Sequence, residues 1–452
     1  MSKSGSSMVK VQSKLTVVSD KPVETGKTYP FSVLDHAMGL HTLHIVFYYR
    51  YDRPKSEDLG HLRASLSHLL TMYPTITGRL RRRAGKEDSN WEVNCNDAGV
   101  RVLVAKVHTT LDEWLRSADG SHERDLTVWE DMPEEDTSTW SPFRIQMNDF
   151  EGGGLAIGLS CTHMSADPTC CTTFFKSWME IDRGVSIAHP PFFHPPGLRS
   201  RACPNTNTKS ADYCATKSKA EHPSPVKTST VTFRFSDKMI KQCLSDIQTE
   251  CPDATPFDFL AALFWSCAMR AKTHMHHDKM CNLSICFDFR KLLHAPLPNG
   301  YFGNALHFLM VSSESSKMNE ASGLAYLAGL VHNHLSNLEE EEFLSAIDWL
   351  GSQRGGGGGT YASPFKMYGP ELTCINMEHL FPYEAILENK KPLHVSYHVG
   401  NVEGEGLILI LPSPEEGLGR TVIVTLPDDQ TDKLRKDPAI VCLEPTMIVS
   451  GS

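Results

Sequence analysis

The stretch from Leu155 to Trp178 holds a histidine and a carboxylate, His163 and Asp167, separated by three residues. It begins as an apolar run that predicts a buried strand, and Asp167-Pro168 then predicts a helix start, with an acidic cap and proline at the first position. A histidine with a pKa of about 6.5 can accept a proton from a hydroxyl or amine as it attacks an electrophile. His163 is therefore a candidate general base.

The aspartate has two open interpretations. Asp167 either orients the imidazole or turns away and pairs with an arginine at the junction of strand and helix. The pattern also fits a buried histidine beside a helix cap, because short motifs match by chance. The residues around His163 and Asp167 are therefore needed to distinguish these interpretations.

Ordered segments along almost the whole chain resemble the plant BAHD acyltransferases. HMSADPTCCTTFFKSW, residues 163–178, is similar to their HxxxDG segment, including its later phenylalanine and tryptophan. PTITGRL, residues 74–80, resembles their P-x-x-G-R-L turn, and PLPNGYFGNA, residues 296–305, their P-x-G-Y-F-G-N segment. Asp288 and Arg290 are similar to the family's D-x-R strand and are expected to be structural.

The resemblance implies an α/β fold of two similar-sized domains, each a mixed β-sheet flanked by helices, as in chloramphenicol acetyltransferase. At 452 residues the chain is long enough for two cores. We expect an N-terminal domain over 1–193 and a C-terminal domain over 228–452. Residues 194–227 are poor in large apolar side chains and rich in Pro, Ser, Thr and Lys, so they predict a linker, and the resemblance implies that it is the family's crossover between the domains.

The implied activity is transfer of an acyl group from acyl-CoA, as co-substrate, to an alcohol or amine acceptor. The two substrates would enter between the domains from opposite faces, with His163 as the base and no other cofactor. No acyl-enzyme is needed, so Ser165 and Cys161 are expected to be inert. An oxyanion donor is expected from the opposite domain. The basic residues of the linker are candidates for the CoA phosphates.

Two departures from the family pattern bear on catalysis. The family's D-F-G-W-G motif, taken as structural and remote from the active centre, corresponds best to Lys366–Leu380, where only Tyr368 and Gly369 survive. Met367 stands for its aspartate, so Asp288 or Arg290 is expected to lack its usual partner. Pro168 replaces the glycine after HxxxD and removes a backbone N–H near the base.

Three further segments resemble the Eceriferum and Glossy branch of the family: Asp35–His41, residues 367–374 and His394–Pro427. This implies a role in very-long-chain lipid and cuticular wax metabolism. The alternative is a non-catalytic accessory factor that binds a subunit of the fatty-acid elongase at the cytosolic face of the endoplasmic reticulum. In either case we expect a cytoplasmic monomer.

Composition excludes several other classes. A net charge of −10 argues against nucleic-acid binding, and no apolar run of eighteen residues predicts a membrane span. The first residues lack the apolar core of a signal peptide, and the thirteen cysteines lack the paired spacing of a zinc site. We interpret His36, His41 and His44 as structural histidines near a cleft, and residues 274–278 as a solvated loop. The glycines of 355–359 lack the ending of a phosphate-binding loop. No metal is expected.

Overall fold

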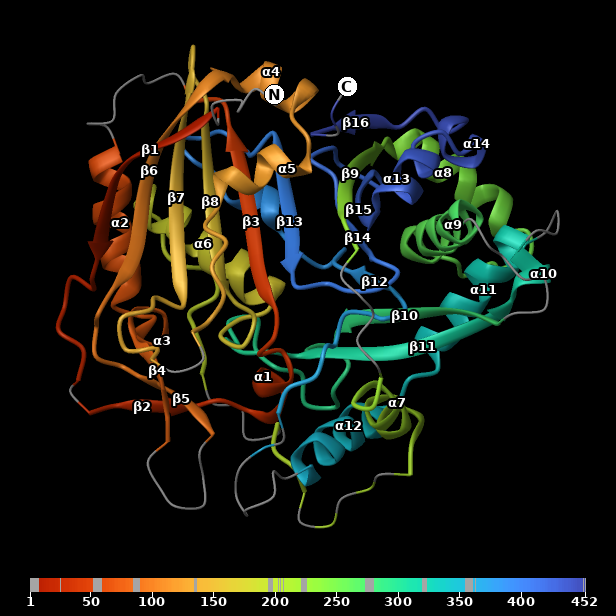
Figure 1. Cartoon of the computed structure of the whole chain (residues 1–452), viewed down its shortest axis with the longest axis horizontal. Helices are drawn as coiled ribbons and strands as arrows, with labels where there is room; N and C mark the ends of the chain where they lie inside the picture. The colour runs from red at the N-terminus through yellow and green to blue at the C-terminus, as the bar shows by residue number, and fades with distance from the viewer. Residues whose placement is uncertain are drawn as a thin grey trace.

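The computed structural model describes residues 8–24, 26–51, 59–83, 90–133, 136–193, 198–201, 203, 205, 207–220, 226–272, 280–318, 323–353, 361, 363–449 and 451. The histidine-rich residues 274–278 and the glycines of 355–359 lie outside them. Two sheet-centred bodies lie side by side, one built mainly from the N-terminal half and one from the C-terminal half (Figure 1). This confirms the expected fold class.

The N-terminal body contains a six-stranded mixed sheet. In spatial order its strands are β1 (Val9–Val17), β6 (Val100–Thr110), β7 (Phe143–Glu151), β8 (Leu155–Thr162), β3 (Thr42–Tyr49) and β13 (His394–Gly400). A three-stranded sheet of β2 (Thr28–Pro30), β5 (Trp91–Asn94) and β4 (Arg79–Arg82) lies at one end. Every residue of β3 and β8 is buried, as expected for continuous apolar strands in the middle of a covered sheet.

The C-terminal body contains a seven-stranded mixed sheet. Its spatial order is β11 (Leu306–Glu314), β10 (Met280–Asp288), β12 (Leu372–Asn376), β14 (Leu407–Pro412), β15 (Arg420–Pro427), β9 (Thr228–Phe235) and β16 (Thr446–Ile448). The central pairs β10–β12 and β12–β14 are parallel, and the other pairs are antiparallel.

One strand crosses between the bodies. Strand β13 comes late in the chain, yet it pairs antiparallel with β3 and forms the edge of the N-terminal sheet. Figure 1 shows this blue strand beside the red β3. The linker at residues 194–227 therefore divides the sequence into two halves, but the N-terminal sheet contains a strand from the second half. The linker is also partly structured, because it contains helix α7 (Lys209–Lys217), which packs on α12 (Glu340–Ser352).

Helices cover both sheets. The N-terminal body has α1 (Val33–Ala37), α2 (Gly60–Leu70), α3 (Pro74–Thr77), α4 (Leu111–Ser117), α5 (Gly120–Glu123) and α6 (Pro168–Asp182). The C-terminal body has α8 (Asp237–Ile247), α9 (Pro256–Ala271), α10 (Ser315–Met318), α11 (Gly323–Ser336), α12 (Glu340–Ser352), α13 (Asp428–Leu434) and α14 (Pro438–Val441). Helix α6 packs on α2, where the Trp178 indole N–H donates to the Leu62 carbonyl at 3.1 Å.

Candidate active site

The junction of β8 and α6 forms as the sequence predicts. Asp167 has extended backbone angles at the N-cap, and its Oδ1 accepts the Cys170 N–H at 2.9 Å. Pro168 occupies the first helical position, where no backbone donor is needed. The turn between strand and helix places His163 just beyond the end of β8.

The remaining oxygen of Asp167 settles which of its two interpretations holds. Asp167 Oδ2 lies 2.8 Å from Arg290 Nη1 and accepts the Ala305 N–H at 3.0 Å. Both side chains of this ion pair are buried. Asp167 therefore pairs with an arginine of the C-terminal body instead of orienting the imidazole, and the pair fastens the two bodies together.

Arg290 has further partners that correct our expectation for the D-x-R residues. Its guanidinium also pairs with Asp288, and its Nη2 donates to the Gly303 carbonyl at 2.7 Å. Asp288 in turn accepts from Thr169 Oγ1 at 2.6 Å. Asp167 supplies the second carboxylate for Arg290, so replacement of the family's usual aspartate by Met367 leaves neither Asp288 nor Arg290 unpaired. Burial opposes charge on Asp288, but Arg290 and His379 hold its pKa below the ordinary value.

Residues from two distant segments hold the backbone of His163. Its N–H donates to the His41 carbonyl at 2.9 Å, and its own carbonyl accepts from Asn304 Nδ2 at 2.9 Å. Asn304 also donates to Asp35 Oδ1, from its backbone N–H at 2.9 Å and from Nδ2 at 2.8 Å. Asn304 thus connects α1, the end of β8 and the segment before β11. Asn304 lies in the family-like segment 296–305, for which the sequence predicted no role in the site.

The ring of His163 is enclosed. The residue is 0 % exposed, and burial lowers the pKa of its imidazole to about 4. Its Nε2 lies 3.0 Å from the Tyr368 hydroxyl. An imidazole with this pKa is neutral at pH 7, as a general base must be. Its Nε2 faces a residue that follows the glycine run and is separated from His163 by about two hundred positions in the sequence.

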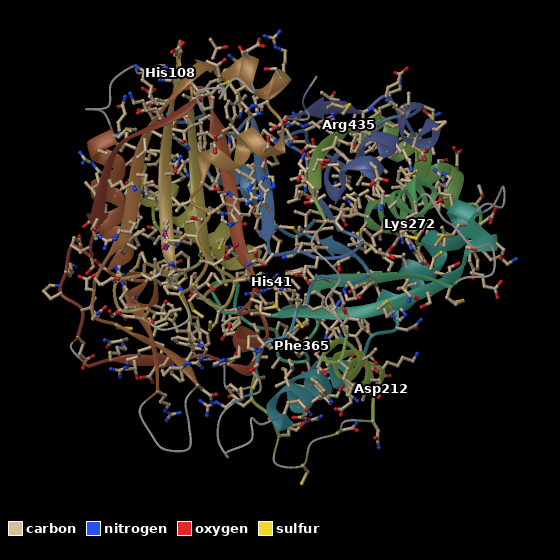
Figure 2. All side chains as sticks on the ribbon, viewed as in Figure 1. His41, His108, Asp212, Lys272, Phe365 and Arg435 are labelled. Carbon is tan, nitrogen blue, oxygen red and sulfur yellow. The ribbon has the colours of Figure 1, made fainter. Side chains whose placement is uncertain are left out.

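The segment 366–371 therefore differs from our expectation. We placed it far from the active centre as the counterpart of D-F-G-W-G, but Tyr368 contacts His163 and the Met367 N–H donates to His41 Nε2 at 3.2 Å. Gly369 has a φ of +92°, and a Cβ there would lie 2.2 Å from the Glu403 carbonyl oxygen, so glycine is required. Figure 2 shows His41 and Phe365 near the middle of the molecule, where the two bodies meet.

Other predicted residues take structural positions. Cys161 is buried with its Sγ 3.6 Å from Cys171 Sγ, and Ser165 is buried too. His41 and His44 are also buried; His41 Nδ1 lies 3.1 Å from the Gly400 carbonyl oxygen. Across the residues that the structure describes, no three His, Cys, Asp or Glu side chains are grouped to hold a metal ion.

Two basic residues of the linker have acidic partners. Arg201 pairs with Glu341 and Asp348, and Lys217 is buried against Glu371. These two residues are therefore poorly placed for CoA phosphates, and the expectation for the other basic residues of the linker stays a prediction.

Two cavities lie where the bodies meet. One, of about 580 Å³, is lined by α6, the start of α9 and the segments after β10 and β12, with Asp288 and Arg290 at its wall. The other, of about 770 Å³, lies between β13 and strands β9, β14 and β15. Thr172 lines the first and Tyr397 the second, and their hydroxyl oxygens are 2.8 Å apart.

Solved structures share the fold of this chain. The crystal structure of vinorine synthase superimposes with a TM-score of 0.69 at 18 % identity, covering 94 % of this chain and 96 % of that one. TRI101 of F. sporotrichioides, solved with coenzyme A and T-2, gives a TM-score of 0.71 at 12 % identity, covering 94 % and 100 %. These likenesses establish the fold.

Sequence comparison gives the family. A model of the Transferase family matches residues 7–440. The chain belongs to this family, the BAHD acyltransferases, which transfer groups other than aminoacyl groups. Relatives include Protein ECERIFERUM 26-like of Arabidopsis thaliana, 27 % identical over 437 residues that cover 93 % of each chain. A hydroxycinnamoyltransferase of Narcissus pseudonarcissus is 27 % identical over 412 residues, covering 86 % of this chain and 90 % of the relative. Within the described ranges, no helix is both long and apolar enough to cross a bilayer.

Proposed function

We propose that this protein transfers an acyl group from acyl-CoA to an alcohol or amine, with His163 as the general base. The observation that carries the proposal is the position of His163 at the junction of the two bodies, with its backbone held by Asn304. Burial lowers the pKa of its imidazole to about 4, which keeps it neutral near pH 7. Because Asp167 is committed to Arg290, the side chain of His163 carries no ion pair with it.

The reaction needs one base and no covalent intermediate on the protein. His163 Nε2 takes the proton of the acceptor while the acceptor oxygen or nitrogen attacks the thioester carbonyl carbon. The tetrahedral intermediate collapses, the carbon–sulfur bond breaks, and the imidazolium returns the proton to the CoA thiolate. General-base help of this kind contributes about 10²- to 10⁴-fold to a rate. An oxyanion donor from the opposite body stays a prediction.

The two cavities are our candidates for the paths of donor and acceptor. Apolar side chains such as Phe257, Leu335 and Leu338 line the 580 Å³ cavity, which suits an acyl chain. Lys176 and Lys291 also line it, and Lys176 is paired with Glu180 and Glu384. We assign the acyl donor to this cavity and the acceptor to the 770 Å³ groove, whose lining is more polar.

Release of free CoA thiol tests the proposal. Wild type and His163→Ala are compared across short, aromatic and very-long-chain acyl-CoAs with pooled alcohols and amines. We expect acceptor-dependent release that falls about 10²-fold or more in His163→Ala. His307→Ala is the matched control, since it also removes a buried imidazole but one whose Nε2 contacts Ser210. Equal release by wild type and His163→Ala would refute the assignment.

A second candidate is the accessory role at the fatty-acid elongase. The complete burial of His163 favours it, since a substrate cannot reach the base without a rearrangement. The similarity to the ECERIFERUM proteins also supports a very-long-chain lipid or cuticular wax role. In this role a monomer would bind an elongase subunit at the cytosolic face of the endoplasmic reticulum. Co-expression with an elongase distinguishes the two: unchanged chain elongation with His163→Ala supports the accessory role.

A further inference from the structure

The Tyr368 hydroxyl contacts Nε2 of His163, the atom to which an acceptor must bind. The hydroxyl oxygen lies 3.0 Å from His163 Nε2, and both residues are 0 % exposed. A general base has to approach the hydroxyl or amine of its substrate to about 2.6–3.2 Å. The Tyr368 hydroxyl already stands within that range, so it takes the position that an acceptor hydroxyl would take.

The Nε2 atom of His163 cannot bond to Tyr368 and act as a base toward a substrate at the same time. Burial raises the pKa of Tyr368 well above its ordinary value, so the phenol is neutral. If the phenol donates, it uses the single lone pair of Nε2; if Nε2 carries the proton, that nitrogen is no base at all. In either tautomer Nε2 cannot accept a proton from a substrate while Tyr368 stays in place.

Neighbouring contacts hold Tyr368 from both sides. Its ring centroid lies 4.8 Å from that of His41 and 5.4 Å from that of Phe308, both in edge-to-face arrangements. The backbone around it is anchored by an ion pair between Lys366 and Glu403 and by another between Glu371 and Lys217. The contact with His163 is thus part of a fastened segment.

We propose that Tyr368 is an internal occupant of the acceptor position, and that an acceptor reacts only after it has displaced the Tyr368 hydroxyl from His163. This inference rests on the proposed acyl transfer. It makes Tyr368 a specificity-determining residue, because an acceptor must bind strongly enough to compete with a hydroxyl that is always present. Water is a poor competitor. The Tyr368 hydroxyl on Nε2 of His163, which we call the cap of His163, therefore protects bound acyl-CoA from hydrolysis.

The test is hydrolysis in the absence of any acceptor. Hydrolysis requires a water oxygen to attack the thioester carbonyl while His163 takes a water proton and passes it to the departing CoA thiolate. We expect Tyr368→Phe to raise acceptor-free release of CoA thiol about 2- to 12-fold, the equilibrium factor for one hydrogen bond. The rise should disappear in the double variant His163→Ala/Tyr368→Phe. Tyr49→Phe is the matched control, because it removes a buried hydroxyl that donates to the Ala385 carbonyl.

A second readout does not depend on turnover. The ring nitrogens of His163, observed by nuclear magnetic resonance, should shift in Tyr368→Phe and stay unchanged in Tyr49→Phe. An unchanged His163 signal in Tyr368→Phe would overturn the cap whatever the release rates. A shifted signal with no release from any variant would instead support the cap and refute the transfer reaction.

Two other outcomes would overturn the inference. Slower hydrolysis or transfer by Tyr368→Phe than by wild type would mean that the hydroxyl assists the reaction. An acyl adduct on Tyr368, found by intact mass and peptide mapping, would mean that the hydroxyl is a nucleophile activated by His163.

Discussion

Replacing Arg290 with methionine removes a cation that two buried carboxylates share. In the folded protein Asp167 is 0 % exposed at its side chain, Asp288 is 5 % exposed and Arg290 is 3 % exposed. Methionine keeps most of the volume of the arginine stem and removes the charge. The substitution therefore tests the ion pair more than the packing.

The expected cost follows from burial. Breaking a buried ion pair by removing one partner costs about 3–5 kcal/mol, because the other charge stays buried without compensation. Here two carboxylates lose their partner, and the Gly303 carbonyl also loses a donor. We therefore expect the upper half of that range.

Lowering the pH should reduce the difference in the free energy of unfolding between wild type and Arg290→Met. Arg290 and His379 hold the folded-state pKa of Asp288 below its ordinary value of about 3.9. A carboxyl with a depressed pKa contributes stability above its unfolded pKa, and this stability is lost as the pH falls toward the folded pKa. Since Arg290→Met lacks this contribution, wild type and variant should converge as the pH falls below about 4.

Urea unfolding followed by tryptophan fluorescence measures the effect. The control is Arg50→Met, which breaks an exposed pair with Asp112 whose side chains are 60 % and 58 % exposed. Exposed pairs contribute about 0–1 kcal/mol, so the control should unfold near the wild-type midpoint. A midpoint for Arg290→Met as close to wild type as that of Arg50→Met would refute the reasoning.

Three further predictions concern the same site. Because the pKa of His163 is about 4, the acid limb of kcat/KM should fall near pH 4 and not near 6.5; a limb at 6.5 would show an exposed base. The free energy of unfolding should decrease as the pH is lowered from about 6.5 toward 4, because His163 is protonated in the unfolded chain over this range but stays neutral when buried. The decrease due to His163 is roughly 3 kcal/mol. In His163→Ala the free energy of unfolding should therefore depend less on pH over the same range. Asn304→Ala should cost about 1–3 kcal/mol in urea unfolding, because buried Asp35 loses a donor, whereas Asn282→Ala, at an exposed contact with Ser312, should cost less than 1 kcal/mol.

The parts of this site that the sequence predicted are those set by local signals. The apolar run of β8, the cap at Asp167 and proline at the next position each act within a few residues, and the structure has all three. Helix α9 begins in the same way, with a side-chain cap at Thr255 followed by proline. Local hydrogen bonds and fixed backbone angles decide such features, so neighbours along the chain suffice to predict them.

The parts that the sequence missed depend on long-range packing. Pairing of β13 with β3 joins segments separated by some 350 residues, and nothing in either strand specifies the other. The contact of Tyr368 with His163 is of the same kind. The partner of Asp167 stayed open for a related reason: the choice between imidazole and guanidinium depends on which group the second body brings within reach. A surviving aromatic beside Gly369 was the available signal for Tyr368, but it was interpreted as a remnant of a remote motif.

The contacts that position His163 also make it inaccessible, and this constrains how the protein works. Asn304 and His41 fix the backbone of the base, while Arg290 fixes the helix that follows, so these contacts cannot open without loosening the junction of the two bodies. The Tyr368 side chain is different. Breaking the hydrogen bond between its hydroxyl and Nε2 costs about 0.5–1.5 kcal/mol, far less than breaking the Arg290 pair, and the anchored backbone of its segment can stay in place. Access to the base is therefore most easily gained by moving Tyr368, and the identity of the acceptor depends on what can offer His163 a better hydrogen bond than this phenol.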